Sequence, residues 1–453
     1  MAARRKGGVI LTLLHQVAYP FNVLLASMND RSLAELALKF FPFVLLLELP
    51  LFLLVCSGIL RYGLRRLRED HQREQYPSVS CIITCYSEGE DVRKTIESLA
   101  HQIYRGPIQI IAVIDGAIQN GPTLRAALAE SDHVAPLHDR ALLVLPKWQR
   151  GGRVSSLNAG LKMATGQIVM ALDGDTSFDN DMVANATRHF DDPDVVAVSG
   201  CLRVRNANAS LVARLQALEY VLSIGAGKTG LSEFNLVNNI SGAFGIFRTR
   251  FIRLLGGWDA GTAEDLDITL RIKQYFGRYP HLRIVFEPHA VGHTDAPDTW
   301  RGFWRQRLRW DGDLLYLFLR KYRRNIRPRL LGWPNFLFTL VNGVFMQVLM
   351  PFVIVLYTFV MLWYLPLGSV LGVLALVYVV YWFSVLILFG LYLIIVSERP
   401  GYDLGYLWLT PLLPAFAFAN RVHSTFSLLQ EASIKAHLDS SMAPWWVLRK
   451  TKF

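Results

Sequence analysis

Long apolar stretches lie toward both ends of this 453-residue chain, and a region of shorter apolar runs separates them. Phe40–Leu60, Leu337–Tyr364 and Ser369–Val396 are each long enough to cross a bilayer as a helix. The last two stretches contain no Asp, Glu, Lys, Arg or His. The pattern therefore predicts membrane helices on either side of a central domain.

Two further apolar stretches are less regular. Val9–Ala26 is interrupted by polar residues and a proline, and Asp403–Leu429 is interrupted by Pro411 and Pro414. If all three C-terminal stretches crossed, the C-terminus would lie outside, whereas the basic residues at 449–452 favour the inside. A re-entrant or interfacial last segment resolves this conflict.

Between the apolar ends, short apolar runs alternate with segments of helical spacing. The helical segments include Asp91–Gln102 and Ser155–Ala164. The predicted strands are Val79–Thr84, Ile108–Ile114, Ala141–Leu145, Ile168–Leu172 and Val195–Ser199. This alternation predicts an α/β domain with a mostly parallel sheet, whose ligands bind at the carboxyl ends of the strands.

Basic residues border the predicted membrane helices. The chain has a net charge of +11 and a mean hydropathy of +0.28. The bordering clusters are Arg61, Arg65, Arg66 and Arg68, and Arg320, Lys321, Arg323 and Arg324. Because such clusters are typical of cytoplasmic boundaries and anionic headgroups, we favour a lipid bilayer over nucleic acid as the partner. We expect a multi-pass inner-membrane protein with a cytoplasmic central domain.

Acidic residues follow two of the predicted strands. Asp173 and Asp175 flank a glycine, and two carboxylates at a strand end are suited to hold Mg²⁺ or Mn²⁺ together with a diphosphate. Asp115 ends another strand and is placed to accept a hydrogen bond from a base or ribose. A simple turn explains each motif equally well when it is taken alone.

Glu264 and Asp265 precede a helical pattern. Sugar transfer with inversion needs a base for the acceptor hydroxyl, and Asp265 is our candidate, with Glu264 orienting it. Helix capping is the alternative. Further on, Gln306, Arg309 and Trp310 share one helix face, where Arg can bind diphosphate oxygens and Trp can stack on a sugar. An amphipathic interfacial helix accounts for the same residues.

Taken in this order between membrane helices, these motifs resemble those of the processive family-two glycosyltransferases. That family includes the poly-N-acetylglucosamine, cellulose, hyaluronan and chitin synthases. The resemblance extends over Pro77–Gly312. Within the family, the two N-terminal apolar stretches and the run Gly302–Trp310 look most like those of the poly-β-1,6-N-acetylglucosamine synthases. The resemblance implies a GT-A nucleotide-sugar fold, which is Rossmann-like, inserted between transmembrane helices.

The resemblance also assigns site residues. The implied donor site comprises Tyr86, Glu88, Asp115, Arg153, Asp173 and Arg309. The implied acceptor site comprises Gln306, Trp310, Ser241 and Gly242. Asp173 and Asp175 match the metal pair, and Asp265 with Glu264 matches the catalytic acids. The chain departs from the family at Ser87, Arg153 and Ala263, where Asn, Lys and Thr are usual.

The expected function is processive, inverting polymerisation of a UDP-sugar, with UDP-N-acetylglucosamine as the best candidate, and passage of the polymer across the membrane. The predicted domains are residues 1–62 (transmembrane), 63–327 (cytoplasmic GT-A) and 328–453 (transmembrane, interfacial and basic tail). The expected partners are the donor, the growing polysaccharide, the bilayer and an accessory membrane subunit.

Three alternatives remain open at this point. The chain transfers a single sugar to a polyprenyl phosphate, is a synthase of the cellulose or hyaluronan type, or is a transporter or scaffold with an inactive domain. The intact Asp173, Asp175 and Asp265 argue against the last of these. His289 and His293 are candidates for a third metal ligand, although ordinary packing or hydrogen bonding explains them as well.

Overall fold

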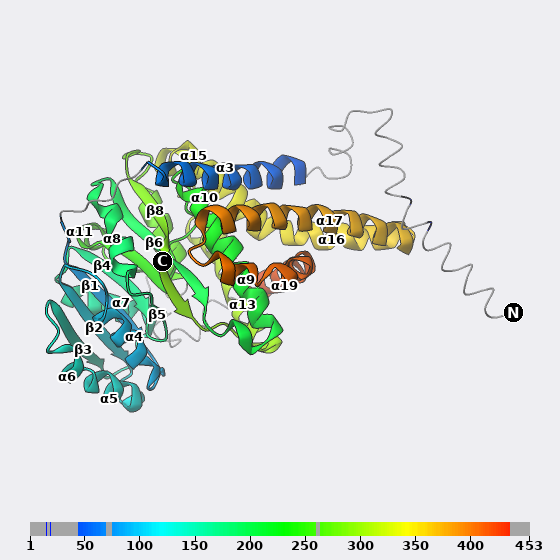
Figure 1. Ribbon diagram of the computed structural model, residues 1–453. Coiled ribbons are helices and arrows are strands. Elements are labelled where there is room, and N and C mark those ends of the chain that lie inside the picture. The colour runs from blue at the N-terminus through cyan, green and yellow to red at the C-terminus, as the bar shows by residue number, and fades with distance from the viewer. Residues whose placement is uncertain (1–14, 16–18, 20–43, 69–74, 260–262, 435–453) are drawn as a thin grey trace.

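The computed structural model describes residues 15, 19, 44–68, 75–259 and 263–434. Strands from this part of the chain form one sheet in the order β3-β2-β1-β4-β7-β6-β8-β5, on the left of Figure 1. The strands are β1 (Val79–Cys85), β2 (Ile108–Asp115), β3 (Arg140–Lys147), β4 (Ile168–Asp173), β5 (Ser177–Phe178), β6 (Val195–Val204), β7 (Phe244–Arg248) and β8 (Arg283–Thr294).

Most neighbouring strands of the sheet are parallel, as predicted. Strands β3, β2, β1 and β4 run parallel, and β6 runs parallel to β8. Strand β7 is antiparallel to both β4 and β6, and β5 is antiparallel to β8, so the sheet is mixed. The five predicted strands are present. The prediction missed β5 and β7 because they are short, and β8 because Glu287, Pro288 and His289 interrupt its apolar pattern.

Helices cover both faces of the sheet. One face is covered by α4 (Asp91–Ala100), α5 (Gly121–Ala129), α6 (Ser131–Val134) and α8 (Met182–Thr187). The other is covered by α7 (Gly152–Met163), α11 (Thr249–Leu254) and α12 (Glu264–Lys273). In α4, Val92, Ile96 and Leu99 follow a helical period and are fully buried. Strand β1 is buried along its whole length because both of its faces are covered.

Further helices connect the sheet to the long apolar helices. After β6 the chain forms one helical segment with a π-helical middle: α9 (Leu211–Tyr220), η4 (Val221–Lys228) and α10 (Thr229–Ser232). After β8 it forms α13 (Trp300–Leu315) and the π-helix η5 (Tyr316–Lys321). The short 3₁₀ helices η2 (Arg188–Asp191) and η3 (Ala207–Ala209) flank β6.

Three helical segments of the described chain are long and apolar enough to cross a membrane: Leu46–Arg66, Trp333–Tyr364 and Leu367–Val396. They extend to the right of the sheet in Figure 1. Their elements are η1 (Val44–Glu48), α3 (Leu49–Arg66), α15 (Trp333–Phe338), η6 (Thr339–Leu349), α16 (Met350–Tyr364), α17 (Leu367–Leu391) and η7 (Tyr392–Val396). The short α14 (Pro328–Leu331) precedes α15.

These helices correspond to the three uninterrupted apolar stretches in the sequence. The first continues six residues past the predicted end at Leu60, so the predicted domain boundary at residue 62 falls within α3. The stretch Val9–Ala26 lies outside the described residues, apart from positions 15 and 19. The ambiguous stretch Asp403–Leu429 begins in α18 (Pro400–Leu404) and continues through η8 (Leu407–Leu412) and α19 (Leu413–Ile434).

The sheet domain and the long helices share one apolar cluster. Ile59 of α3, Leu218 of α9, Phe303 of α13 and Phe389 of α17 are buried together in it. Helix α3 also crosses α10 at very short range: a Cβ atom added to Gly230 would lie 2.3 Å from the carbonyl oxygen of Val55. The domain is therefore packed directly onto the apolar helices.

Candidate active site

The loop after β1 carries Tyr86 and Glu88 at the carboxyl edge of the sheet. Ser87 between them has φ = 76°, a left-handed conformation that Asn tolerates better than Ser. The Arg150 guanidinium lies 4.1 Å from the centre of the half-exposed Tyr86 ring. Burial raises the pKa of Glu88, and the nearby Asp175 adds to that effect. The loop therefore places one aromatic and one acidic side chain beside the end of β4.

Asp115, at the end of β2, is almost fully buried and already holds several donors. Its Oδ1 accepts from Lys147 Nζ at 2.7 Å and from the backbone N–H of Gly151 at 2.8 Å. Its Oδ2 accepts from the backbone N–H of Gly152, also at 2.8 Å. Because a carboxylate has about four acceptor positions, about one is left for a ligand. Asp115 thus anchors the start of α7.

Asp173 and Asp175 stand at the end of β4, as predicted. Asp173 lies opposite Thr84 in the β1–β4 register, and Asp175 is exposed. The intervening Gly174 permits a close approach of β1, because a Cβ atom there would lie 3.1 Å from both Cys85 Sγ and the carbonyl oxygen of Thr84. The glycine therefore allows both carboxylates to emerge at one tightly packed strand end.

Arg153 joins this strand end to the second acidic segment. Its guanidinium contacts the Asp173 carboxylate, the Glu264 carboxylate and the carbonyl oxygen of Gly242, and donates to Thr84 Oγ1 at 2.9 Å. The Arg153 side chain is 8% exposed. One buried cation thus bridges the predicted metal pair, the predicted catalytic acids and the predicted acceptor segment.

Asp265 lies in the first turn of α12. Its Oδ2 accepts from Asn239 Nδ2 at 2.9 Å, and its Oδ1 accepts from the backbone N–H of Leu266 at 2.7 Å. Burial raises the pKa of Asp265, and the neighbouring Glu264 raises it further. The preceding Ala263 has φ = 49°, an uncommon conformation for a residue with a side chain. The turn thus presents a basic carboxylate at the sheet edge.

Ser241 and Gly242 border these acids. A Cβ atom on Gly242 would lie 3.2 Å from Glu264 Oε1 and 3.4 Å from Asp265 Cβ, so the glycine leaves room for both acids. The backbone N–H of Ser241 donates to Ser199 Oγ on β6 at 3.1 Å. This segment therefore holds the acids against β6.

The residues on α13 are less closely connected. Gln306, Arg309 and Trp310 lie on a helix as predicted, and Trp310 is 37% exposed with the Arg307 guanidinium 5.0 Å from its ring centre. Within the described residues, the buried Oε1 of Gln306 has no hydrogen-bond partner. Asp311 accepts from Ser424 Oγ at 2.7 Å, which ties α13 to α19.

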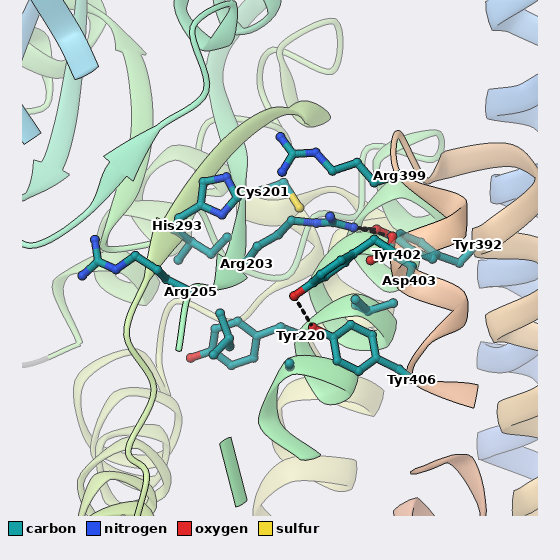
Figure 2. Close-up of a pocket in the computed structure, with 14 residues that line it drawn as sticks. Cys201, Arg203, Arg205, Tyr220, His293, Tyr392, Arg399, Tyr402, Asp403 and Tyr406 are labelled. Carbon is teal, nitrogen blue, oxygen red and sulfur yellow. Dashed lines mark hydrogen bonds and ion pairs between the residues drawn. The ribbon is translucent and has the colours of Figure 1, made fainter. Parts of the chain in front are cut away.

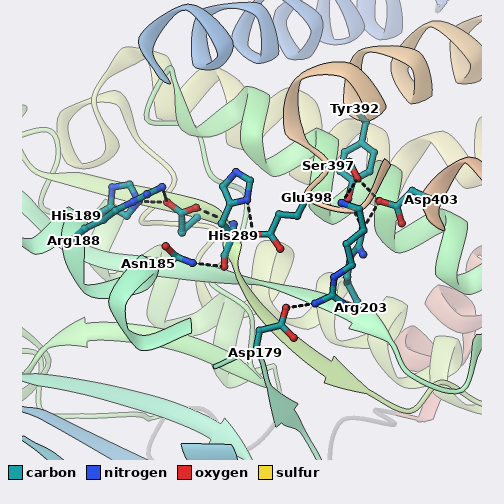
Figure 3. Close-up of polar contacts among 12 residues, drawn as sticks. Asp179, Asn185, Arg188, His189, Arg203, His289, Tyr392, Ser397, Glu398 and Asp403 are labelled. Atoms are coloured by element: carbon teal, nitrogen blue, oxygen red, sulfur yellow. Dashed lines mark hydrogen bonds and ion pairs between the residues drawn. The ribbon is translucent and has the colours of Figure 1, made fainter. Parts of the chain in front are cut away.

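The two histidines near this region have other partners. His289 Nδ1 contacts Glu398, and His293 Nε2 lies 2.9 Å from Asp179 Oδ1 (His289, Glu398 and Asp179 in Figure 3). Within the described residues, no group of three His, Cys, Asp or Glu side chains is placed to hold a metal ion. These contacts favour the interpretation of the two histidines as hydrogen-bonding residues that join β8 to neighbouring segments.

A cavity of about 270 Å³ lies between β6, α9 and the segment after η7. Figure 2 shows its aromatic and basic lining, including Arg203, Tyr402 and Tyr406. Arg203 is paired with the buried Asp403, and Arg399 lies 2.6 Å from Asp179. His293, a candidate metal ligand, lines this cavity, whereas none of the predicted donor, acceptor or catalytic residues does.

Sequence reasoning missed three polar residues around the acids: Lys147, Lys228 and Asn239. Lys147 follows an apolar run just as Asp115 does, so its place at the end of a parallel strand was a usable signal. Lys228 and Asn239 gave no such signal, because they lie in a π-helix and a loop whose positions depend on the antiparallel β7.

Family models match the chain over much of its length. The model described as "Glycosyl transferase family group 2" matches residues 168–419, more than half of the chain. The model described as "Glycosyl transferase family 2" matches residues 80–255. The chain belongs to the family-two glycosyltransferases. The matched ranges include both acidic segments, and the chain is therefore a glycosyltransferase enzyme.

Curated relatives are similar over the central region. The poly-β-1,6-N-acetyl-D-glucosamine synthase of Staphylococcus epidermidis is 30% identical over 267 residues, which are 59% of this chain and 61% of that protein. The enzyme of the same name from Staphylococcus aureus strain COL is 29% identical over 252 residues, which are 55% and 58%. The chain thus spans about three fifths of the length of these relatives.

A solved structure has the same fold. It is a mannosyltransferase from Pyrobaculum calidifontis in complex with GDP-Man and Mn²⁺, with a TM-score of 0.50 and 17% identity, covering 85% of this chain and 99% of that one. At this identity the similarity concerns the fold alone. It confirms the predicted GT-A architecture for the sheet domain.

Proposed function

We propose that the chain is an inverting glycosyltransferase that extends a polysaccharide from a UDP-sugar at the cytoplasmic face of a membrane. The observation that carries this proposal is the bridge made by Arg153 between Asp173 and Glu264. It brings a pair of carboxylates suited to a metal and diphosphate next to the raised-pKa carboxylate of Asp265. A donor bound at one end of the bridge would face a base at the other.

The residues present fit a divalent metal held jointly with a nucleotide. Mg²⁺ in nucleotide sites is usually bound through one or two carboxylates and the substrate phosphates, and Asp173 and Asp175 supply two carboxylates. The Mn²⁺ reported for the structural relative agrees with this assignment. When bound, the metal would neutralise the charge that develops on the departing diphosphate.

The chain's own residues would act as follows. Tyr86 and Glu88, together with the remaining acceptor position of Asp115, would receive the base and ribose. Arg153 and Arg309 would hold diphosphate oxygens, a role for which guanidinium is suited by its fork of donors.

Asp265 Oδ2 would take the proton of the acceptor hydroxyl as that oxygen attacks the anomeric carbon. Its raised pKa favours this proton transfer. Glu264 would keep the turn and the cation of Arg153 in place.

The acceptor would approach from α13. Trp310 is exposed enough to stack on a sugar ring, and Gln306 lies one turn before it on the same helix. Ser241 and Gly242 would line the space beside the base, because the missing side chain of Gly242 leaves its backbone against Glu264 and Asp265. We therefore assign elongation to the α13 side and donor binding to the β1–β4 side.

The sugar is proposed from the relatives. Two of them are poly-β-1,6-N-acetyl-D-glucosamine synthases, so UDP-N-acetylglucosamine is the donor that we propose, and a β-linked polymer is the product. The three apolar helices packed against the domain would provide the membrane anchorage and the route for the polymer. We also propose an accessory membrane subunit as a partner.

One assay tests this function. Purified full-length chain with Mn²⁺ is given a panel of UDP-sugars, with and without a polyprenyl phosphate, and UDP release and product mass are measured. We expect UDP-N-acetylglucosamine to yield a polymer without the polyprenyl phosphate. A product of one sugar on the polyprenyl phosphate would replace this proposal with single-sugar transfer. Turnover of none of the donors would contradict it.

The cytoplasmic location of residues 63–327 has its own test. An Asp132→Cys variant is made in a chain that also carries Cys56→Ser, because Asp132 is exposed on α6 and the other cysteines are buried. We expect an impermeant thiol reagent to label the new cysteine only after cell lysis. Labelling in intact cells would place the domain on the outer side.

A further inference from the structure

The carboxylate of Asp265 is held by a residue outside its own helix. Asn239, in the loop before β7, donates from Nδ2 to Asp265 Oδ2 at 2.9 Å. The loop is fixed in turn, because the N–H of Ile240 donates to Thr269 Oγ1 at 2.8 Å and Thr269 Oγ1 donates to the carbonyl oxygen of Asp265 at 2.6 Å. Asn239 and α12 therefore keep a fixed relation to each other.

The other end of Asn239 is held by a buried lysine. Lys228, the last residue of η4, donates from Nζ to the carbonyl oxygen of Asn239 at 2.9 Å and is only 4% exposed. Burial lowers the pKa of Lys228 to about 8, whereas Asp265 acts to raise it. A buried ammonium is costly unless a nearby charge compensates it, and Asp265 is such a charge.

The segment that carries Lys228 is held against the first long helix. Gly230, two residues later, lies so close to α3 that an added Cβ atom would overlap the backbone of Val55. A Cβ atom on Gly225, which precedes Lys228 on η4, would lie 2.6 Å from the ring of Tyr392 on η7. π-Helical turns of this kind occur often at functional sites. Lys228 thus has little freedom to move away from Asn239.

The charged groups around Asp265 come from three elements. Glu264 on α12 is a neighbouring negative charge, and its carboxylate is paired with Arg153 on α7. Lys228 on η4 is a positive charge that acts on Asp265, and it favours the ionised carboxylate. Loss of the Lys228 charge would leave Asp265 beside Glu264 with less compensation.

We infer that Lys228 and Asn239 are positioning residues for the proposed base, which keep the Asp265 carboxylate oriented and ionised at neutral pH. This inference rests on the proposed function. Asn239 fixes the direction of one carboxylate oxygen. The hydrogen bond from Lys228 to the carbonyl oxygen of Asn239 holds the ammonium in place, and its charge compensates that of Asp265. Neither residue needs to touch the donor or the acceptor.

The sign of the effect follows from the charge. An ammonium near a carboxylate lowers the carboxylate pKa, so its removal raises the pKa of Asp265. The rate that depends on ionised Asp265 then falls away at a higher pH than in the wild type. Because Lys228 itself loses its proton near pH 8, the two profiles should converge above that pH.

The chain offers a matched control. Lys273 is also a buried lysine, lies on the same helix as Asp265, and has its pKa lowered to about 7 by burial, with no contribution from Asp265. The experiment compares the pH dependence of kcat/KM for Lys228→Met and Lys273→Met, measured as UDP release from UDP-N-acetylglucosamine with Mn²⁺.

We expect Lys228→Met to move the acidic limb upward by about one pH unit, and Lys273→Met to leave it in place. Asn239→Ala should move it in the same direction. A uniform loss of rate at every pH in Lys228→Met, with no shift of the limb, would overturn the inference and leave the proposed function intact. Retained activity in Asp265→Asn would overturn the proposed function itself.

A second measurement does not depend on the identity of the sugar. The infrared carbonyl band of protonated Asp265 is assigned by its absence from Asp265→Asn, and its titration is followed in the folded full chain. We expect the band to persist to a pH about one unit higher in Lys228→Met than in Lys273→Met. Identical titrations would contradict the inference.

Discussion

The two acidic segments of the site are supported in different ways. Asp115 ends β2 and Asp173 ends β4, the two parallel strands on either side of β1. Asp115 is held by residues at the end of β3 and the start of α7. Asp265 instead depends on a loop before β7 and on a lysine in η4. The donor side is thus built at the ends of neighbouring strands, whereas the base side is assembled from elements far apart in the sequence.

This difference shows how the apolar helices can influence catalysis. The segment that carries Lys228 contacts α3 through Gly230 and approaches η7 through Gly225. The strands that end in the donor-side residues pack instead against α4 and α7. We therefore expect changes at the helix–domain boundary to affect proton transfer more than nucleotide binding.

The largest effect should come from removing the base and leaving the donor side intact. Asp265→Asn keeps the shape and loses the proton acceptor, so we expect the rate of sugar transfer to fall by roughly 10²- to 10⁴-fold. Binding of UDP with Mn²⁺, measured by calorimetry, should stay near that of the wild type. The exposed Asp132→Asn serves as the control. Near-normal transfer in Asp265→Asn would remove this residue from the mechanism.

The converse change should damage the donor side. In Asp175→Ala, we expect Mn²⁺-dependent UDP binding to be lost, because one carboxylate together with the diphosphate holds a cation less well than two carboxylates together with the diphosphate. Asp181→Ala, another exposed acid a few residues away, should bind UDP normally. Full activity in excess EDTA would show that no divalent metal is needed.

A smaller effect should appear at the bridge between the two sides. Arg153→Gln removes a cation that lies against Asp173, so free Mn²⁺ should bind at least about tenfold more tightly in the absence of UDP. Binding of UDP should weaken at the same time. Arg153→Lys is the matched variant, because it keeps the charge and loses the fork. Paramagnetic resonance of Mn²⁺, with and without UDP, measures Mn²⁺ binding in both variants. An unchanged Mn²⁺ affinity in Arg153→Gln would contradict the proposed role of Arg153 as a bridge.

The smallest effect concerns the boundary. Gly230→Ala would place a Cβ atom 2.3 Å from the carbonyl oxygen of Val55, so we expect the fold to lose about 1–3 kcal/mol. Gly390→Ala is the control, since a Cβ atom there meets nothing within 4 Å. Thermal unfolding in detergent should show a lower Tm for Gly230→Ala only. Equal Tm values would show that the α3–α10 crossing can relax.

The contrast between the donor side and the base side also explains which parts of the fold the sequence could predict. The parallel half of the sheet was readable because strands buried on both faces are continuous apolar runs, and Asp115 and Asp173 directly follow such runs. Strands β5 and β7 are too short to give a pattern, and β8 contains Glu287 and His289, which hold polar partners inside the fold. The mixed topology therefore had to come from the structure.

The sequence also predicted only part of the candidate site. Gln306 and Trp310 were assigned through a family resemblance, and their roles stay predictions. Asn239 and Lys228 were not predicted at all, since their proximity to Asp265 depends on the packing of η4 and the β7 loop. Asp173 and Glu264, which the sequence did predict as site residues, are joined in the structure by the buried Arg153 side chain.

We propose above that nucleotide and metal bind at the β1–β4 edge, beside Asp265. A structure of the full chain with UDP and Mn²⁺ tests it most directly. We predict that Mn²⁺ is bound by Asp173, Asp175 and the diphosphate, and that Arg153 has moved from Asp173 toward the phosphates. Nucleotide in the cavity lined by Arg203 and Tyr402, or Mn²⁺ on His293, would contradict the account.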